Sequence, residues 1–222
     1  MATELEKLMK GGKSVEQAVA ELLPKVVKEN KRIIFNGNNY SKEWEKEAGK
    51  RGLLNLKNTV DALPQMVSKD VIATFEKYKV LTGRELHARY EIMVEQYNKT
   101  VNIEGQLMVL MANRYILPAA IEYQKQVAQS VAAVKSAGGK AAESKKLLDA
   151  VIKLTDSIKK GSDKLAKELS HEGANAEKHA KHFRDAVIPA MTALRASADT
   201  LEDMMPHALW PLATYREMLF IK

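Results

Sequence analysis

The chain has 222 residues, of which 45% are hydrophobic and 28% are charged, a composition typical of globular proteins with a sizeable core. The absence of cysteine excludes disulfide frameworks, thiolate metal sites and cysteine nucleophiles. The net charge of +7 raises the question of nucleic-acid or membrane partners. However, no apolar run approaches the roughly 20 residues of a membrane span, and the N-terminus lacks the apolar core of a secretory signal.

The first predicted helix begins at Ser14, where Gln17 completes a capping box. Its apolar residues recur at helical spacing and share one face: Val15, Ala18, Val19, Leu22, Leu23, Val26 and Val27. Pro24 lies inside this pattern and lacks an amide donor, so we expect the helix to bend or restart there.

A turn is predicted over the stretch Asn36 to Tyr40, which follows the short apolar run at 33–35. Asparagine and glycine accept left-handed backbone conformations, so the stretch indicates a reversal between two helices. Its backbone amides could alternatively hold an anion. Ser41 is predicted to cap the next helix, which should end at Gly52.

The longest predicted helix begins at Thr82, where Glu85 completes a second capping box, and continues to Ala137 with a bend at Pro118. Such a helix is too long to be covered by one small neighbour, so other long helices should lie beside it. Its apolar residues recur every three or four positions and should form the buried face: Leu86, Tyr90, Met93, Tyr97, Val101, Met108, Met111 and Tyr115.

Two further long helices are predicted at about 141–170 and 175–205, after a turn at Gly138 and Gly139. Pro189 should bend the last helix. Apolar residues of the last helix should face those of the preceding one: Phe183, Val187, Leu194 and Leu201 against Leu147, Val151, Leu154 and Ile158. Short connections impose an up, down and up course. The predicted fold class is therefore all-α, an antiparallel bundle of three long helices with shorter N-terminal helices packed against it.

Glu104 falls in the apolar row between Val101 and Met108, where burying a lone carboxylate is costly. Either Glu104 reaches water, or it is buried beside a cationic or hydrogen-bonding partner from another helix. We expect it to be at least partly buried, with Arg184 and Arg195 as candidate partners. The same face offers no second carboxylate or histidine for acid–base chemistry, so no catalytic role is predicted.

Histidines cluster near the loop between the last two predicted helices, where the sequence places His171, Glu172, His179 and His182. The spacing of three between His179 and His182 makes a metal site conceivable. Because the Glu-x-x-His pattern of bundle di-iron sites is missing, we expect solvated histidines instead.

Lysines alternate with acidic residues between Lys135 and Lys167, and no aromatic residue accompanies them. Base-stacking surfaces need aromatic residues beside the cations. The pattern therefore favours a solvated helix face over a nucleic-acid or anionic-surface patch.

Phosphate loops, nucleophile–base pairs and metal quartets are absent from the sequence. We therefore predict no catalytic, cofactor-binding or metal-binding residue in this chain. Taken alone, it does not have the features of an enzyme.

Six stretches, in the same order, resemble the distal part of type III glutamine synthetases, the long-subunit bacterial form. They are RIIFNGNNYSKEWEKEAGKRGLLNL (32–56), TVDALP (59–64), LTGRELHARYEIMVEQYNKTVNIE (81–104), RYILPA (114–119), RDAVIPAMTALRASADTLE (184–202) and WPLATYREMLF (210–220). Three positions depart from the family pattern: Asn39 replaces an expected glycine, Gly105 stands where alanine would suit a helix, and Ala213 replaces a common proline.

This resemblance implies that residues 1–64 are the terminal helices of a catalytic domain, arranged helix-turn-helix, and that 65–222 are a C-terminal helical bundle extension. The full-length protein would ligate ammonia to glutamate with ATP and Mg²⁺, as a cytoplasmic homo-oligomer in nitrogen metabolism. Its metal-binding and phosphate-binding residues would lie upstream, so Met1 is expected to mark a truncation. The segment itself would have a structural or assembly role, with the upstream catalytic domain of the same chain as partner and neither nucleic acid nor membrane as partner.

The alternative is a free-standing helical-bundle module that binds a partner protein, and a more distant one is a cationic surface binder. Without an upstream domain, the apolar face from Val15 to Val27 should self-associate, fray or turn back on residues 33–35.

Overall fold

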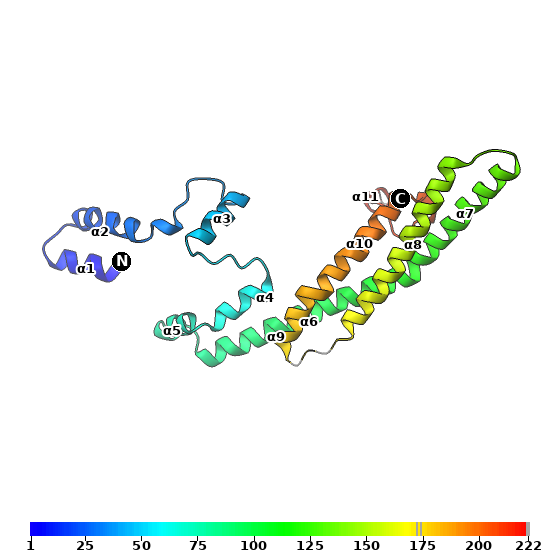
Figure 1. The fold of residues 1–222 in the computed structure, drawn as a ribbon. Coiled ribbons are helices and arrows are strands. Elements are labelled where there is room, and N and C mark those ends of the chain that lie inside the picture. The colour runs from blue at the N-terminus through cyan, green and yellow to red at the C-terminus, as the bar shows by residue number, and fades with distance from the viewer. Residues whose placement is uncertain (172, 174, 221–222) are drawn as a thin grey trace. The chain divides into compact units, whose positions relative to one another are not determined.

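The structure is a computed structural model that describes residues 1–171, 173 and 175–220 (Figure 1). These residues form helices and connecting segments, with no β-strand among them, which confirms the predicted all-α class. The chain divides into two compact units, Met1–Asn58 and Thr59–Lys222.

The first unit contains α1 (Ala2–Lys10), α2 (Val15–Glu29), η1 (Lys31–Ile33) and α3 (Lys42–Lys50). Helix α1, which the sequence patterns did not predict, packs against α2. The predicted capping box is present, since Gln17 N donates to Ser14 Oγ and Ser14 N donates to Gln17 Oε1. Helix α2 continues through Pro24 without a restart. The predicted cap at Ser41 is confirmed by a hydrogen bond from the amide of Trp44.

Only part of the predicted apolar face of α2 is buried. Ala18 and Leu22 are buried, whereas four other members of that face are exposed: Val15, Val19, Leu23 and Val27. Because α1 is a single short helix, it covers one side of α2 and leaves the rest of the apolar surface open.

The second unit begins with three short elements, α4 (Thr59–Ala62), η2 (Leu63–Val67) and α5 (Lys69–Lys77). The expected domain division after residue 64 falls inside η2, which packs against the first long helix. The elements that follow are α6 (Gly83–Met111), η3 (Ala112–Ile116), α7 (Leu117–Ser136), α8 (Ala142–Leu169), α9 (Ala176–His182), η4 (Phe183–Val187), α10 (Ile188–Glu202), η5 (His207–Leu209) and α11 (Tyr215–Leu219).

Each proline predicted to bend a long helix is preceded by one turn of π-helix. The π-turn η3 ends two residues before Pro118, and η4 ends two residues before Pro189. A proline ring crowds the carbonyl of the residue four positions earlier and leaves it without an amide donor. A wider turn at this point accommodates the ring, and it shifts which side chains of the following helix face the core.

Helix α8 runs back alongside α7 after a turn at Gly138, whose φ of +84° lies in the left-handed region (Figure 1). It also packs against α6 and α10. One hydrophobic cluster joins these helices, and it contains the residues predicted to meet there: buried Val151, Ile158, Phe183, Val187, Leu194 and Leu201, with partly buried Leu147 and Leu154. None of the described helices has the length and hydropathy of a membrane span.

The buried face of α6 differs in part from the predicted one. Leu86 and Val101 are buried as expected, but Met93 and Tyr115 are exposed. The positions that are buried instead are Val94, Asn98 and Gly105. The face advances by four residues at each step from Leu86 through Tyr90 and Val94 to Asn98. Asn98 meets the first residue of α9, and Gly105 lies against the last residue of α8.

Candidate functional site

The predicted histidine cluster lies where α8 ends and α9 begins. The rings of His171 and His182 lie with their centroids 4.2 Å apart, and the ring of His179 stacks on Phe183 at 4.4 Å. His182 Nε2 is 3.0 Å from the backbone oxygen of Glu168. The contacts of His182, the last residue of α9, hold this helix against the end of α8, whereas the stack of His179 on Phe183 lies within the last long helix.

Burial, together with the neighbouring His182 and His171, lowers the pKa of His179, so its neutral form is favoured in the fold. Glu172, the remaining member of the predicted cluster, lies outside the described residues. Within the part of the chain that the structure describes, no group of three or more His, Asp or Glu side chains could hold a metal ion. Among the described residues, the histidines of the cluster make ring contacts and one backbone contact.

Glu104 is exposed, so the prediction that it lies partly buried beside a partner from another helix is wrong. The buried position in that turn is the next residue, Gly105. A Cβ atom at Gly105 would lie 2.8 Å from Cδ2 of Leu169, the last residue of α8. The glycine thus allows the end of α8 to approach α6 closely, and Glu104 is directed to the solvent side.

The two arginines proposed as partners of Glu104 bind other carboxylates. Arg195 pairs with Asp199 one turn later, with 3.3 Å between Nε and Oδ2. Arg184 donates through Nε and Nη2 to the two carboxylate oxygens of Asp185, at 2.6 and 2.8 Å. Its Nη1 donates to Asp61 in α4.

The Arg184 network joins two segments that are distant in sequence. The hydrogen bonds to Asp185 raise the pKa of Arg184 and lower that of Asp185, so both groups stay charged. Through Asp61, the guanidinium attaches α4 to the π-turn η4. Sequence reasoning missed this contact, although both residues lie in stretches that carry the family resemblance, TVDALP and RDAVIPA.

Two side-chain amide contacts between helices, both partly buried, also escaped the sequence analysis. Asn98 Nδ2 donates to the backbone oxygen of Ala176 at 2.9 Å, which ties α6 to the start of α9. Asn113 Nδ2 donates to Ser162 Oγ at 2.9 Å, which ties η3 to the middle of α8. Asparagine in an otherwise apolar helical row is the signal that could have indicated them.

The turn from Asn36 to Tyr40 is stabilised by its own groups. The amide of Tyr40 donates to Asn38 Oδ1 at 3.0 Å, and the amide of Ser41 donates to the Asn38 carbonyl at 3.0 Å. No asparagine of the turn has a positive φ, so the predicted left-handed conformation is not used there. The side chain of Asn38 thus accepts a hydrogen bond within the turn, and the amide of Tyr40, one of those that could hold an anion, is already bonded.

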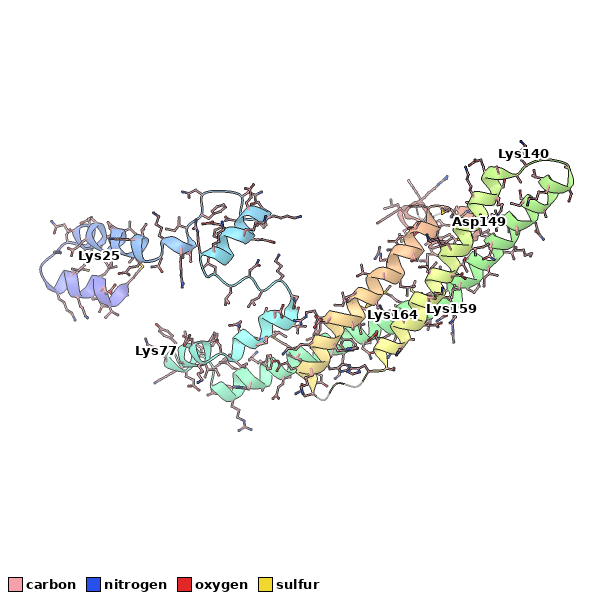
Figure 2. All side chains as sticks on the ribbon, in the orientation of Figure 1. Lys25, Lys77, Lys140, Asp149, Lys159 and Lys164 are labelled. Atoms are coloured by element: carbon pink, nitrogen blue, oxygen red, sulfur yellow. The ribbon has the colours of Figure 1, made fainter. Side chains whose placement is uncertain are left out.

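Three lysines of α8 form ion pairs along the helix. Lys145 lies 3.1 Å from Asp149, Lys146 lies 2.8 Å from Glu143, and Lys159 pairs with Asp163. Figure 2 shows Asp149, Lys159 and Lys164 spread along this helix. Pairs three or four residues apart on an exposed helix are typical of a solvated face, which supports that interpretation of the charge.

The polar groups described above form helix caps, ion pairs and contacts between helices. None of them places a nucleophile beside a base. These groups therefore position helices relative to one another.

Comparison with known proteins identifies relatives of the whole chain. A family model described as the glutamine synthetase C-terminal domain matches residues 18–135, more than half of the chain. A glutamine synthetase of Butyrivibrio fibrisolvens is 32% identical over 213 residues. A type-3 glutamine synthetase of Dictyostelium discoideum is 30% identical over 217 residues, and a glutamine synthetase of Bacteroides fragilis is 27% identical over 226 residues.

The alignments with the first two relatives cover 94% of this chain but only 30% of each relative's length. The chain thus spans less than a third of the length of the proteins that it matches. The resemblance found in the separate sequence stretches is confirmed by the family match and by these alignments, which cover 94% of the chain. The chain belongs to the glutamine synthetase C-terminal domain family.

Proposed function

We propose that the chain is the C-terminal helical part of a type-3 glutamine synthetase and that its role there is structural, in the assembly of the enzyme. One observation carries the proposal: nearly all of the chain aligns with glutamine synthetases while spanning 30% of their length. The contacts of the described residues agree with such a role, because their polar groups connect helices.

In this proposal, the ligation of ammonia to glutamate is the activity of the full-length, cytoplasmic protein with ATP and Mg²⁺. Phosphoryl transfer to a carboxylate depends on metal ions and cationic groups fixed around the reacting oxygens. The arginines in the Arg184 and Arg195 ion pairs are bound to aspartates of this same chain. The groups that hold nucleotide and metal would therefore come from the rest of the protein.

The proposed partner of the first unit is the upstream catalytic domain of the same chain. On α2, Val15 is 53% exposed, Leu23 49% and Val27 46%, a contiguous apolar face on a helix with a complete N-terminal capping box. Such a face normally lies against other protein. In the second unit, we propose that α6–α7, α8 and α9–α10 act as three antiparallel rods of one bundle within a homo-oligomer.

The catalytic part of the proposal is tested with the 222-residue chain itself. Incubation with ATP, glutamate, ammonia and Mg²⁺ should yield no glutamine above background, and calorimetry should show no saturable ATP binding. Glutamine formation that stays proportional to this protein through successive purification steps would contradict the proposal.

The structural part is tested by hydrogen exchange. Amides in 5–30 should exchange rapidly because the face of α2 lacks its partner, while those in α8 and α10 should be protected. Uniform protection of a strictly monomeric chain would instead favour a free-standing helical module.

A further inference from the structure

Helix α6 carries apolar side chains on two opposite faces. Ile103, Leu107 and Leu110 are 65%, 52% and 39% exposed, and their spacing of four and three places them in one row. We call these three residues the outer stripe. Each lies two positions along the chain from a buried residue: Ile103 from Val101, Leu107 from Gly105 and Leu110 from Ala112. Two positions correspond to a rotation of about 200° around an α-helix, so the exposed and the buried residues lie on opposite faces.

The outer face of α8 is different in kind. It carries lysine–aspartate pairs such as Lys145 with Asp149 and Lys159 with Asp163, which water can solvate. When a helix has apolar residues on one face and charged residues on the other, burying the apolar face leaves only charged residues in contact with water. Because α6 has apolar residues on both faces, burial of its inner face leaves the outer stripe without a partner.

Charged residues lie beyond both ends of the outer stripe. Lys99 and Glu95 precede Ile103 by about one and two turns, and Arg114, in η3, follows Leu110 by about one turn. Glu95 is paired at 2.8 Å with Lys99 on the same helix, and both side chains are largely exposed. Arg114 is exposed as well.

This order of charges allows one self-complementary pairing, that of Arg114 with Glu95. In an antiparallel pair of α6 helices, the register that sets Ile103 of one copy against Leu107 of the other also sets Arg114 within one residue of Glu95. A twofold axis repeats each such contact, so both ends of the stripe gain an acid–base pair. Pairing with opposite direction also places the helix dipoles favourably.

We propose that the outer stripe of α6 is an interface with a second copy of this chain, formed as an antiparallel helix pair and closed at each end by Arg114 and Glu95. The inference rests on the homo-oligomer proposed above and names its surface. It does not depend on the ligase reaction.

A charge-exchange cycle tests the register. Sedimentation equilibrium of the 222-residue chain gives the dissociation constant of the self-association. Arg114→Glu and Glu95→Arg should each raise that constant about tenfold or more, because each sets like charges face to face. The double variant should recover the affinity, since the pair is restored with its signs exchanged. Arg84→Glu, at an exposed position in the first turn of α6, is the matched control and should change little.

Cross-linking tests the contact directly, because the chain has no cysteine of its own. A mixture of the Ile103→Cys and Leu107→Cys chains, oxidised with glutathione disulfide, should form covalent dimers faster than the Ile121→Cys chain alone. Ile121 lies on α7 and is 57% exposed, so it controls for random collision.

The outcomes separate this inference from the broader proposal. A chain that stays monomeric at all concentrations would overturn both the homo-oligomer and its surface. If the chain self-associates but the charge exchanges do not change the dissociation constant and the two cysteine chains do not cross-link, self-assembly stands and the outer stripe is not its interface. Single exchanges that weaken association without recovery in the double variant would overturn the antiparallel register.

Discussion

Asn113, in the π-turn η3, donates a hydrogen bond to the hydroxyl of Ser162 on α8, with 2.9 Å between Nδ2 and Oγ. Ser162 is fully buried, and the same amide also donates to the carbonyl of Val109 at 3.0 Å. The widened turn before Pro118 is thus tied both to its own helix and to the neighbouring one. A polar contact at this depth favours one alignment of the two helices over alternatives shifted along the axis.

Replacing Ser162 with alanine should lower the free energy of unfolding of the second unit by about 1 kcal/mol, because one buried hydrogen bond is lost. Ser157→Ala is the control: Ser157 bonds to Ser197 at 2.9 Å but is exposed, so its loss should stay below about 0.5 kcal/mol. Urea unfolding followed by Trp210 fluorescence in a Trp44→Phe background reports on the second unit. Equal effects of the two alanine variants would contradict a special role for the buried contact.

Val187→Asp should destabilise the second unit by about 3 kcal/mol or more, since Val187 is fully buried and the new carboxylate would have no partner. Ile152→Asp introduces the same charge on α8 at a side chain that is 37% exposed, and it should cost about 1 kcal/mol or less. Thermal melts of both variants provide the measurement. An unchanged melting temperature for Val187→Asp would argue against the packing of η4 on α8.

Gly105→Ala brings two opposing effects. Alanine favours the helix by up to about 1 kcal/mol, but its Cβ would lie 2.8 Å from Cδ2 of Leu169. We expect little or no gain in the natural chain and a gain in a Leu169→Ala background, where the space is free. A double-mutant cycle of unfolding free energies measures the coupling. Strict additivity would show that Leu169 does not constrain this position.

Arg184→Lys should loosen α4 and η2 from the rest of the second unit. Lysine keeps the positive charge but cannot bond both oxygens of Asp185 and also reach Asp61, as the planar guanidinium does. Hydrogen exchange of amides in 59–67 should become faster, while exchange in α8 stays unchanged. Arg195→Lys, at an exposed pair within α10, is the matched control. If both variants speed exchange in 59–67, the effect does not come from the contact between Arg184 and Asp61.

The stability of the second unit should fall as the pH drops below the ordinary histidine pKa of 6.5, because the folded state lowers the pKa of His179. Above pH 6.5, His179 is neutral in both the folded and the unfolded chain, and the folded state keeps its full stability. As the pH falls toward and through the lowered pKa, the unfolded chain takes up a proton that the folded chain binds less readily, and part of this stability is lost. Unfolding midpoints at pH 8, 6.5 and 5 should show a smaller decline for His179→Gln than for the natural chain, with His207→Gln as the control. An identical decline in all three chains would contradict this.

Local sequence signals were sufficient for the features that depend on neighbouring residues. The capping boxes of Ser14 with Gln17 and of Thr82 with Glu85 are present as predicted. The turn predicted at Gly138 and Gly139 is also present, with Gly138 in the left-handed region. Each of these features is decided within one turn of helix, where side chain and backbone meet regardless of the rest of the chain. Helical periodicity also identified the all-α class, because it records which residues must leave water.

Only the tertiary structure decided which faces met and which polar groups were paired. The exposure of Glu104 and the burial of Gly105 depend on Leu169, which comes from another helix. Arg184 pairs with Asp61 across 123 positions of sequence, and Asn113 reaches Ser162 across 49. The π-turns before Pro118 and Pro189 also rotate the helices that follow, so a regular period cannot be carried through them. Sequence alone therefore determined the long helices and the family of this chain. Contacts between distant segments determined how those helices fit together, because such contacts leave no periodic signal.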